Sequence, residues 1–339
     1  MMAGTGVPMN DATPRRARPP YEEMVAFATR APSVHNTQPW LWRTSETGLE
    51  LFADWSRLLS RADPDGRDLL LSCGAALHHL RIAAAALGWI ADVRHAPDPH
   101  SPGLLASITF SPEEVSEETA RRLTCLMERQ TDRRRFASWP LAREQLESLT
   151  RAGSTWGAEV TWVEDEAVRL RLLRLTAEAD RRQRRDPAYS TELGTWARDR
   201  ACDGVPDSNV PEAIPPGAAE GIVPQRFPPG TLVDEARDRA SIPPDIVVIA
   251  TSSDDGLSRV RAGEALSAVW LEATRKGLLG VPLSQATEVD ETRALLENRE
   301  LHDRACPQIL LCLGWPREDR TPLTATPRRP VRQIMLRGD

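Results

Sequence analysis

The most informative segment of this 339-residue chain reads Ala31-Pro-Ser-Val-His-Asn-Thr-Gln-Pro-Trp-Leu-Trp42. An amphipathic pattern over residues 21–30 predicts a short helix before it, and residues 40–43 predict the start of a strand after it. Pro32 cannot continue the helix, and Pro39 favours an extended backbone at the residue before it. The polar residues between the two prolines therefore form a loop that is pinned at both ends. Such a loop is a suitable place to hold a ligand rich in hydrogen-bond acceptors.

Taken one by one, these residue types also fit an ordinary capped turn. The whole string from 32 to 40, Pro-Ser-x-x-Asn-x-Gln-Pro-Trp, resembles the flavin-contacting loop of the nitroreductase family, whose members hold FMN non-covalently at a subunit interface. His35 and the sequence after it resemble the Acg-like branch of that family. The resemblance implies that Pro32, Ser33 and Asn36 contact the ribityl chain and the isoalloxazine of FMN.

Composition describes a globular chain of one or two domains. Its length suggests two domains on a prior of about 150 residues each, and its 40% hydrophobic and 27% charged residues are typical of a folded protein. A net charge of −6 argues against general binding of nucleic acid. The longest apolar run, residues 82–91, is too short to cross a bilayer, and the Arg-rich residues 1–19 predict a disordered arm without the apolar segment of a secretory signal.

The five cysteines are scattered and odd in number, and none form Cys-x-x-Cys, so neither a zinc site nor a disulfide framework is expected. We expect Cys73, Cys306 and Cys312 to be buried thiols in a cytoplasmic protein. The six histidines show no metal-binding spacing, and no metal site is expected.

The chain contains an internal repeat. Residues 74–88 align with residues 263–277 at a constant offset of 189, and both segments follow an Asp-Gly turn. Both are later followed by an apolar strand and a proline. Several matches in the same order indicate a duplication. We therefore divide the chain into an arm (1–19), a first nitroreductase-like half (20–128) and a second half (129–339).

The two halves are not equivalent. Where the first half has its Pro-Ser loop, the second has Gly153-Ser-Thr-Trp-Gly-Ala-Glu-Val160, without the prolines or the Asn. In two-chain members of the family, each flavin site takes this loop from one subunit and an Arg-rich motif from the other. The resemblance therefore implies a pseudo-dimer within one chain that holds one FMN and is monomeric or a weak homodimer.

A second candidate for contact with the cofactor opens the second half. In Arg129-Gln130-Thr131-Asp-Arg133 the two guanidinium groups and the hydroxyl are the donors that a phosphate requires. The family pattern is Arg-Arg-Ser-x-Arg, so Gln130 and Thr131 depart from it. The alternative interpretation is a charged helix end.

Two further segments resemble parts of the family's flavin site. Pro282, Leu283, Ser284 and Gln285, after a predicted turn at Gly280, resemble a segment whose backbone amides lie near flavin N5 and the pyrimidine edge. A plain exit from a helix into a loop is the alternative.

Near the end of the chain, Pro327-Arg-Arg-Pro330 resembles the Arg-x-Pro that reaches the phosphate. Arg328 or Arg329 is the expected ligand, and we favour Arg329 because it precedes Pro330; an exposed basic tail is the alternative. The Pro- and Gly-rich residues 202–230 resemble the insertion that the Acg-like branch folds over its flavin as a lid.

The expected architecture is an α+β nitroreductase fold, a mostly antiparallel sheet flanked by helices, in two tandem halves. The expected function is an FMN-dependent oxidoreductase that passes electrons from NAD(P)H to a nitro compound, a quinone or a similar small acceptor. No catalytic side chain is expected, because the flavin carries the chemistry. An FMN-binding storage protein with little turnover is the alternative, and a flavin-free remnant is the third interpretation.

Overall fold

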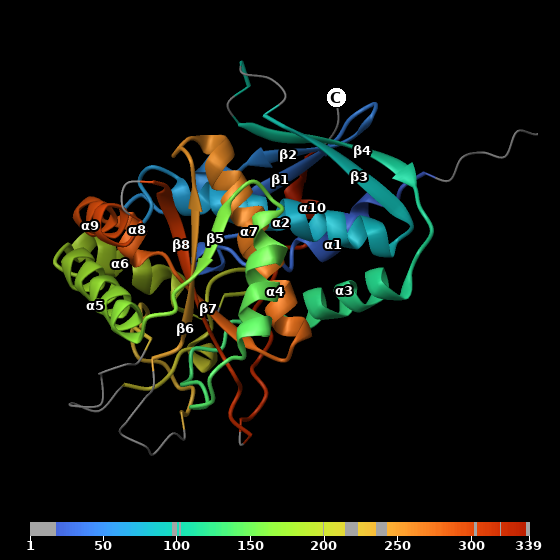
Figure 1. Ribbon diagram of the computed structural model, residues 1–339. Coiled ribbons are helices and arrows are strands. Elements are labelled where there is room, and N and C mark those ends of the chain that lie inside the picture. Colours follow the sequence, from blue (N-terminus) through green and yellow to red (C-terminus); the bar gives the residue numbers. More distant parts are fainter. Residues whose placement is uncertain are drawn as a thin grey trace, which may run out of the picture.

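The computed structural model describes residues 18–96, 100–101, 103–198, 200–213, 223–234, 243–301, 304–318 and 320–336. Two mainly antiparallel sheets each pack against one of two long helices that lie against each other in the centre of the molecule (Figure 1). The predicted α+β class with mostly antiparallel strands is confirmed. The predicted arm lies outside the described residues except for its last two positions.

The first sheet has the strand order β3-β4-β2-β1-β9, and all its pairs are antiparallel except β1 with β9. Strand β9 comes from the end of the chain, so the second half completes the sheet of the first. Helices α1 and α2 supply most of the other apolar side chains of this core. The elements are α1 (Tyr21–Ala28), β1 (Trp40–Thr44), β2 (Gly48–Ala53), α2 (Arg67–Ala86), β3 (Trp89–His95), β4 (Leu104–Pro112), α10 (Val331–Ile334) and β9 (Met335–Leu336).

The second sheet has the order β5-β6-β8-β7 and is antiparallel throughout. Helices α4 and α7 share one apolar cluster with it, and α5, α8 and α9 share another on its opposite face. The elements are α3 (Glu117–Glu128), α4 (Arg143–Ser154), β5 (Glu159–Trp162), α5 (Glu166–Gln183), α6 (Pro187–Trp196), β6 (Asp245–Thr251), α7 (Gly256–Arg275), β7 (Leu279–Leu283), α8 (Gln285–Glu288), α9 (Asp290–Glu300) and β8 (Cys306–Gly314).

The offset of the sequence repeat recurs in space. The order β3-β4-β2-β1 of the first sheet matches β7-β8-β6-β5 of the second, element for element along the chain. Helices α2 and α7 meet backbone to backbone at the repeated glycines. A Cβ atom at Gly74 would lie 1.9 Å from the carbonyl oxygen of Val260, and one at Gly263 would lie 1.9 Å from that of Leu71. The two contacts are equivalent in the repeat, because Gly263 lies 189 residues after Gly74 and Val260 lies 189 residues after Leu71.

Several elements have no sequence prediction behind them, namely β3, β7, α6, α8, α9 and the pair α10 and β9. The predicted turn at Gly280 is wrong, since this glycine lies inside strand β7. A Cβ atom there would lie 2.7 Å from the indole nitrogen of Trp270, so the missing side chain makes room for the tryptophan. A glycine in a short strand therefore has the same sequence signature as a turn.

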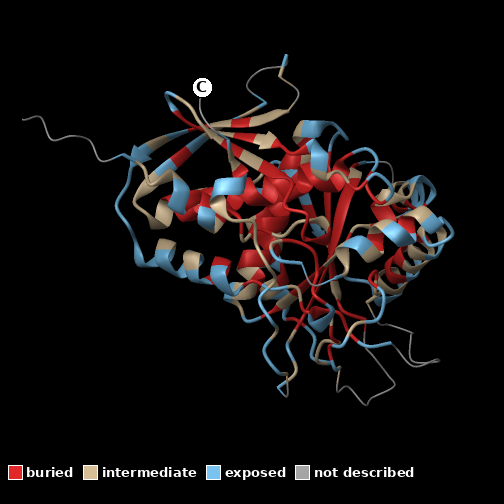
Figure 2. Ribbon diagram, turned by 180° about the vertical axis from the view of Figure 1, so that it is seen from behind, coloured by how far each residue is buried: buried red, intermediate tan, exposed pale blue. Residues whose placement is uncertain are grey.

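Helix α2 is apolar and long enough to cross a membrane by composition, but 83% of its most apolar window is buried inside the fold. Figure 2 shows this buried centre between the two sheets. All five cysteines are free thiols; Cys73 and Cys312 are buried as predicted, whereas Cys306 is only partly buried.

Candidate functional site

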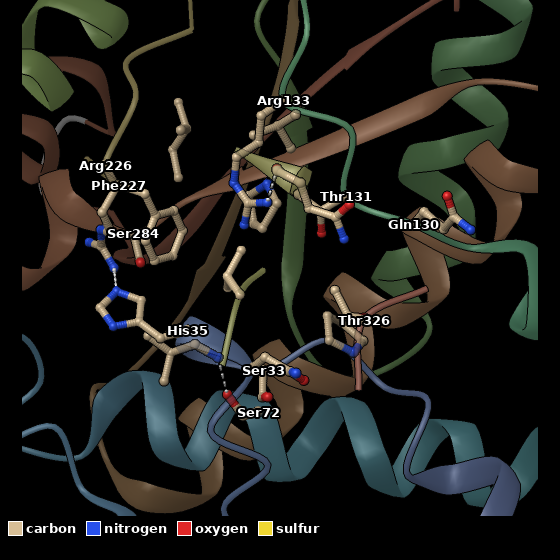
Figure 3. A pocket seen from close by; sticks show the side chains of 18 of the residues that line it. Ser33, His35, Ser72, Gln130, Thr131, Arg133, Arg226, Phe227, Ser284 and Thr326 are labelled. Atoms are coloured by element: carbon tan, nitrogen blue, oxygen red, sulfur yellow. Dashed lines mark hydrogen bonds between the residues drawn. The ribbon is translucent and has the colours of Figure 1, made fainter. Parts of the chain in front are cut away.

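One cavity collects most of the residues that the sequence singled out (Figure 3). Its walls are the loop between α1 and β1, the first turns of α2, the segment after α3, the end of β7, residues 223–227 and the chain after Pro322. Pro32, Ser33, Asn36, Arg129, Gln130, Thr131, Arg133, Pro282, Leu283, Ser284, Gln285 and Arg328 all line it, whereas Arg329 does not.

The loop between α1 and β1 is held in a strained conformation. His35, Asn36 and Gln38 all have positive φ angles, of 47°, 55° and 51°. L-residues rarely adopt this left-handed region, and such strain is retained where the surroundings over-determine it. Here the Val34 amide donates to Ser72 Oγ on α2 at 3.1 Å, and the Gln38 amide donates to Ser33 Oγ at 3.0 Å. The side chain of Ser72 on α2 and that of Ser33 within the loop therefore hold this backbone conformation.

The Asn36 side chain joins this loop to two distant segments. Its amide donates to the carbonyl oxygens of Gly204 at 2.8 Å and Pro327 at 3.0 Å, and its oxygen accepts from Arg328 at 3.2 Å. All of its hydrogen-bonding groups are thus engaged within the chain. Asn36 shapes the cavity wall rather than presenting free donors to a ligand.

Three guanidinium groups gather at one end of the cavity. Arg129 and Arg328 both donate to the Arg30 carbonyl oxygen, at 3.1 Å and 3.5 Å, and Arg30 donates to the Met127 carbonyl oxygen. Within the described parts of the chain none of the three forms an ion pair with a carboxylate. Arg129 Nε and Nη1 are buried without partners, as are Nε of Arg30 and of Arg328.

Burial and mutual proximity lower the pKa of two members of this arginine cluster (Arg30, Arg129 and Arg328). Burial, together with Arg328 and Arg30, lowers the pKa of Arg129 to about 9. Burial and Arg30 lower the pKa of Arg328 to about 10. Cations in such surroundings are stabilised by an anion that accepts their N–H groups. The arrangement of the cluster therefore suits an anionic ligand.

Arg329, the favoured ligand, does not belong to this site. It donates to the Gln38 carbonyl oxygen at 3.1 Å and pairs with Asp54 at 3.2 Å, outside the cavity. Arg328, and not the favoured Arg329, therefore lines the cavity. Of these two neighbours in the tail, Arg329 is the one that pairs with a carboxylate, that of Asp54.

The structure also separates Arg133 from Arg129. Arg133 lies over the Phe227 ring, 4.9 Å from its centroid, and its remaining contact is a 3.5 Å hydrogen bond to the Asn209 carbonyl oxygen. Burial and the nearby Arg226 lower its pKa to about 10. Within the described chain Arg133 therefore supplies a further positive charge that no carboxylate pairs with, next to Phe227 and Asn209 of the segment predicted as a lid.

His35 and Arg226 lie side by side at one wall of the cavity (Figure 3). Arg226 donates to His35 Nε2 at 3.1 Å and forms an ion pair with the buried Glu288. Burial and the Arg226 charge lower the pKa of His35 to about 3, so the imidazole is neutral at physiological pH. Its Nε2 then accepts and its Nδ1 carries the proton.

The other predicted residues form the remaining walls. Thr131 makes a β-bridge with Gly280, which brings the segment after α3 beside strand β7. The Ser284 hydroxyl donates to Glu288 at 2.6 Å, Gln285 is buried in the first turn of α8, and Gln130 lies at the exposed edge. The described parts of the predicted lid, residues 202–213 and 223–230, contact the loop and the cavity, and residues 214–222 lie outside the described chain.

Sequence reasoning missed Arg30, Asp68, Arg226, Phe227 and Glu288. Only Arg30 carries a local signal, because it immediately precedes the loop. The others line the cavity or pair with its residues through contacts between distant segments. Among the described residues no group of His, Cys, Asp and Glu is arranged to hold a metal ion.

No family model matches this chain. One relative is a protein of Mycobacterium tuberculosis H37Rv whose name gives NAD(P)H nitroreductase as its inferred activity. It is 35% identical over 317 residues, and the match covers 92% of this chain and 90% of that protein. Acg of the same strain, also named as an inferred NAD(P)H nitroreductase, is 34% identical over 316 residues, covering 91% and 93%. A solved structure from Anabaena variabilis that carries the nitroreductase name covers 87% of each chain, with 10% identity and a TM-score of 0.50, and shares the fold.

Proposed function

This chain belongs to the NAD(P)H nitroreductase family, and from that membership we propose that it is an FMN-dependent oxidoreductase. NAD(P)H is the electron donor, and a nitro compound, a quinone or a similar small molecule is the acceptor. The observation that carries the proposal is the arginine cluster of Arg30, Arg129 and Arg328, which lies beside the strained loop without a carboxylate partner.

The cluster fits the phosphate of FMN. A phosphate monoester carries nearly two negative charges and three acceptor oxygens, which guanidinium groups bind with charge-assisted hydrogen bonds. Arg129 alone has two buried N–H positions, Nε and Nη1, that no described protein atom satisfies. Binding of the phosphate satisfies these donors and removes the repulsion between the three cations.

The rest of the cavity fits the remainder of the cofactor. When bound, FMN supplies the hydride and electron transfer itself. Arg133 keeps a positive charge against the cavity, which favours the negative charge that a reduced isoalloxazine gains. The loop residues 33–36 and the end of β7 also line this space.

We infer one cofactor per chain. The matching strand orders and the glycine contact between α2 and α7 support a duplicated fold, that is, a pseudo-dimer in a single chain. The first half supplies the loop with Ser33 and Asn36, and the second supplies Arg129 and Arg328. Neither half retains both contributions, so only one composite site remains.

The test is an anaerobic titration of the FMN-loaded protein with NADH and NADPH, followed by a quinone or a nitroarene. We expect one flavin per chain, bleaching of its absorption by NAD(P)H, and recovery of the oxidised spectrum with the acceptor. Two flavins per chain would contradict the composite site. A protein that binds no FMN at any concentration would contradict the function.

A storage protein is the second candidate, and one contact favours it. Phe227 packs edge to face against His35, with ring centroids 5.2 Å apart, and covers the cavity together with Arg226. A cover that stays closed would hold FMN without admitting NAD(P)H. Bound flavin that stays oxidised under saturating NAD(P)H, yet is reduced by dithionite, would support this candidate.

The five free thiols agree with a reducing compartment, which we take to be the cytoplasm.

A further inference from the structure

A buried acidic cluster lies beneath the loop and has no part in the function proposed above. It consists of Asp63 before α2, Asp68 in the first turn of α2 and Glu288 at the end of α8. The groups facing Asp68 are Glu288, Asp63 and Arg226, and Arg226 is the single cation among them. Tyr189 and His35 lie next to the Arg226–Glu288 pair. Asp68 is only 4% exposed and lines the same cavity as Ser33 and His35.

Two of the three carboxyl groups are explained by their partners. Asp63 accepts the backbone N–H groups of Asp68 at 3.1 Å and Leu69 at 2.8 Å, so it caps the start of α2. Glu288 pairs with Arg226 and accepts from the Ser284 hydroxyl. Among the residues that the structure describes, Asp68 has neither kind of partner, and no donor reaches its buried Oδ2.

The contacts of the two carboxyl groups indicate which of them holds a proton. Glu288 has a cation and a hydroxyl donor, whereas among the described residues no donor reaches the buried Oδ2 of Asp68, and burial without a compensating partner favours the protonated form of a carboxyl group. Arg226 lies against Glu288 and stabilises its ionised form. The proton therefore belongs to Asp68.

Electrostatics agree with this assignment. Burial, followed by the charges of Glu288 and Asp63, raises the pKa of Asp68 well above its ordinary value, although Arg226 opposes the shift. Burial also favours the neutral form of Glu288, but Arg226 and the hydrogen bonds from Asp68 and Ser284 lower its pKa to about 2. Two carboxyl groups in contact thus differ in charge at neutral pH.

We propose that Asp68 is the acid that protonates the electron acceptor in this cavity. The inference rests on the proposed function and names a role that the flavin does not fill. A quinone that accepts a hydride from the reduced cofactor gains two electrons and one hydrogen, and the Asp68 carboxyl supplies the proton that completes the hydroquinone. The cofactor is oxidised by two electrons, and the Asp68 carboxylate recovers its proton from water after the product leaves.

The proposal separates the two halves of the catalytic cycle. Hydride transfer from NAD(P)H to the cofactor consumes no proton from the protein, so a change at Asp68 leaves that half unaffected. Transfer of the hydride from the cofactor to the acceptor consumes one proton. General acid catalysis contributes typically about 10²–10⁴-fold.

The experiment uses Asp68→Asn, with Asp65→Asn, just before the start of α2, as the matched control. Asp65 is exposed and away from the cavity. Stopped-flow measurements follow bleaching of the flavin by NAD(P)H and its reoxidation by a quinone under anaerobic conditions. We expect Asp68→Asn to bleach at the wild-type rate and to reoxidise about 10²-fold more slowly, and Asp65→Asn to match the wild type in both halves. Wild-type reoxidation in Asp68→Asn would overturn the proposal.

A second readout needs no turnover. Burial raises the pKa of Asp63 to about 7, so Asp63 contributes a protonated-carboxyl signal in every variant. Infrared difference spectra of the flavin-free protein at pH 7 should contain a further carbonyl band of a protonated carboxyl group in the wild type and in Asp65→Asn, and Asp68→Asn should lack this further band. Absence of this band from the wild type would overturn the proposal without touching the proposed function.

The two failures are distinguishable. If NAD(P)H fails to bleach the flavin in the wild type and in Asp65→Asn alike, the proposed function fails and the role of Asp68 in it fails as well. If bleaching proceeds and only the effect at Asp68 is missing, the oxidoreductase stands and the acid lies elsewhere.

Discussion

The adjacent residues Arg328 and Arg329 permit a test in which ligand affinity and stability should change in different variants. Arg328 lines the cavity with Arg30 and Arg129 and has no carboxylate partner among the described residues. Arg329 faces away and pairs with Asp54 at 3.2 Å, and the side chains of this pair are 10% and 11% exposed. We compare Arg328→Gln with Arg329→Gln.

The magnitudes follow from these contacts. Loss of a charge-assisted hydrogen bond to the phosphate costs about 1.5–3 kcal/mol, which corresponds to about 10- to 150-fold weaker FMN binding. The same change removes a positive neighbour that lowers the Arg129 pKa, so the flavin-free Arg328→Gln protein should be as stable as the wild type or more so. Arg329→Gln instead leaves the largely buried Asp54 without its cation, at a cost of up to about 3 kcal/mol, and FMN affinity should stay unchanged.

Two assays check these expectations. Quenching of FMN fluorescence gives the dissociation constant, at low and at high salt and in competition with inorganic phosphate. Urea unfolding of the flavin-free proteins gives the free energy of unfolding. If Arg329→Gln weakens FMN binding as much as Arg328→Gln does while it is still folded, our assignment of the phosphate to the arginine cluster is refuted. An Arg328→Gln protein with wild-type affinity would refute it equally.

Three further outcomes follow from the packing and the charges. Gly263→Ala should lower the free energy of unfolding by about 1–3 kcal/mol, because its Cβ would meet the Leu71 carbonyl oxygen at 1.9 Å; Gly194→Ala, in open space on α6, should raise it by up to about 1 kcal/mol, and equal effects in urea unfolding would contradict the helix contact. Asn36→Ala leaves two carbonyl oxygens without a donor, so stability should fall by about 1–3 kcal/mol and FMN should bind more weakly; unchanged flavin retention would count against this wall of the site. Burial and nearby arginines lower the His78 pKa to about 3, so its imidazole stays neutral in the folded state while the unfolded chain takes up a proton near pH 6.5. The folded state therefore loses stability as pH falls from about 6.5 towards 3. In His78→Gln the free energy of unfolding should fall less steeply over this range, by about 1.4 kcal/mol per pH unit. Equal pH dependence of the free energy of unfolding in the two proteins between pH 5 and 7 would show that His78 is protonated when folded.

Much of the fold was predictable because its signals are local. The two prolines and the polar residues between them predicted the loop, and the structure places it between α1 and β1 as expected. The 189-residue offset was read from short matches, and it reappears in the backbone contact at Gly74 and Gly263. In contrast, Gly280 was taken for a turn because its true reason, space for Trp270, depends on a residue of another element.

Part of the candidate site was predictable for the same reason. Arg129, Thr131 and the residues around Pro282 were singled out by short patterns, and tertiary contacts bring them to one cavity. Which arginine of the tail turns inward was not predictable, since the two neighbours differ only in what surrounds them. Their separation is decided by Asp54, far away in the sequence.

By itself, the sequence determined where the loop, the helix before it, the strand after it and the two repeated helices lie, because backbone preferences and apolar periodicity act over a few residues. Only the tertiary structure decided the charge state of the site. It brought Arg30, Arg129 and Arg328 together at one end of the cavity and placed Asp68 beside Glu288. The physical reason is that the charge of a buried group depends on solvent exposure and on the groups within a few ångströms of it. Folding alone determines those neighbours.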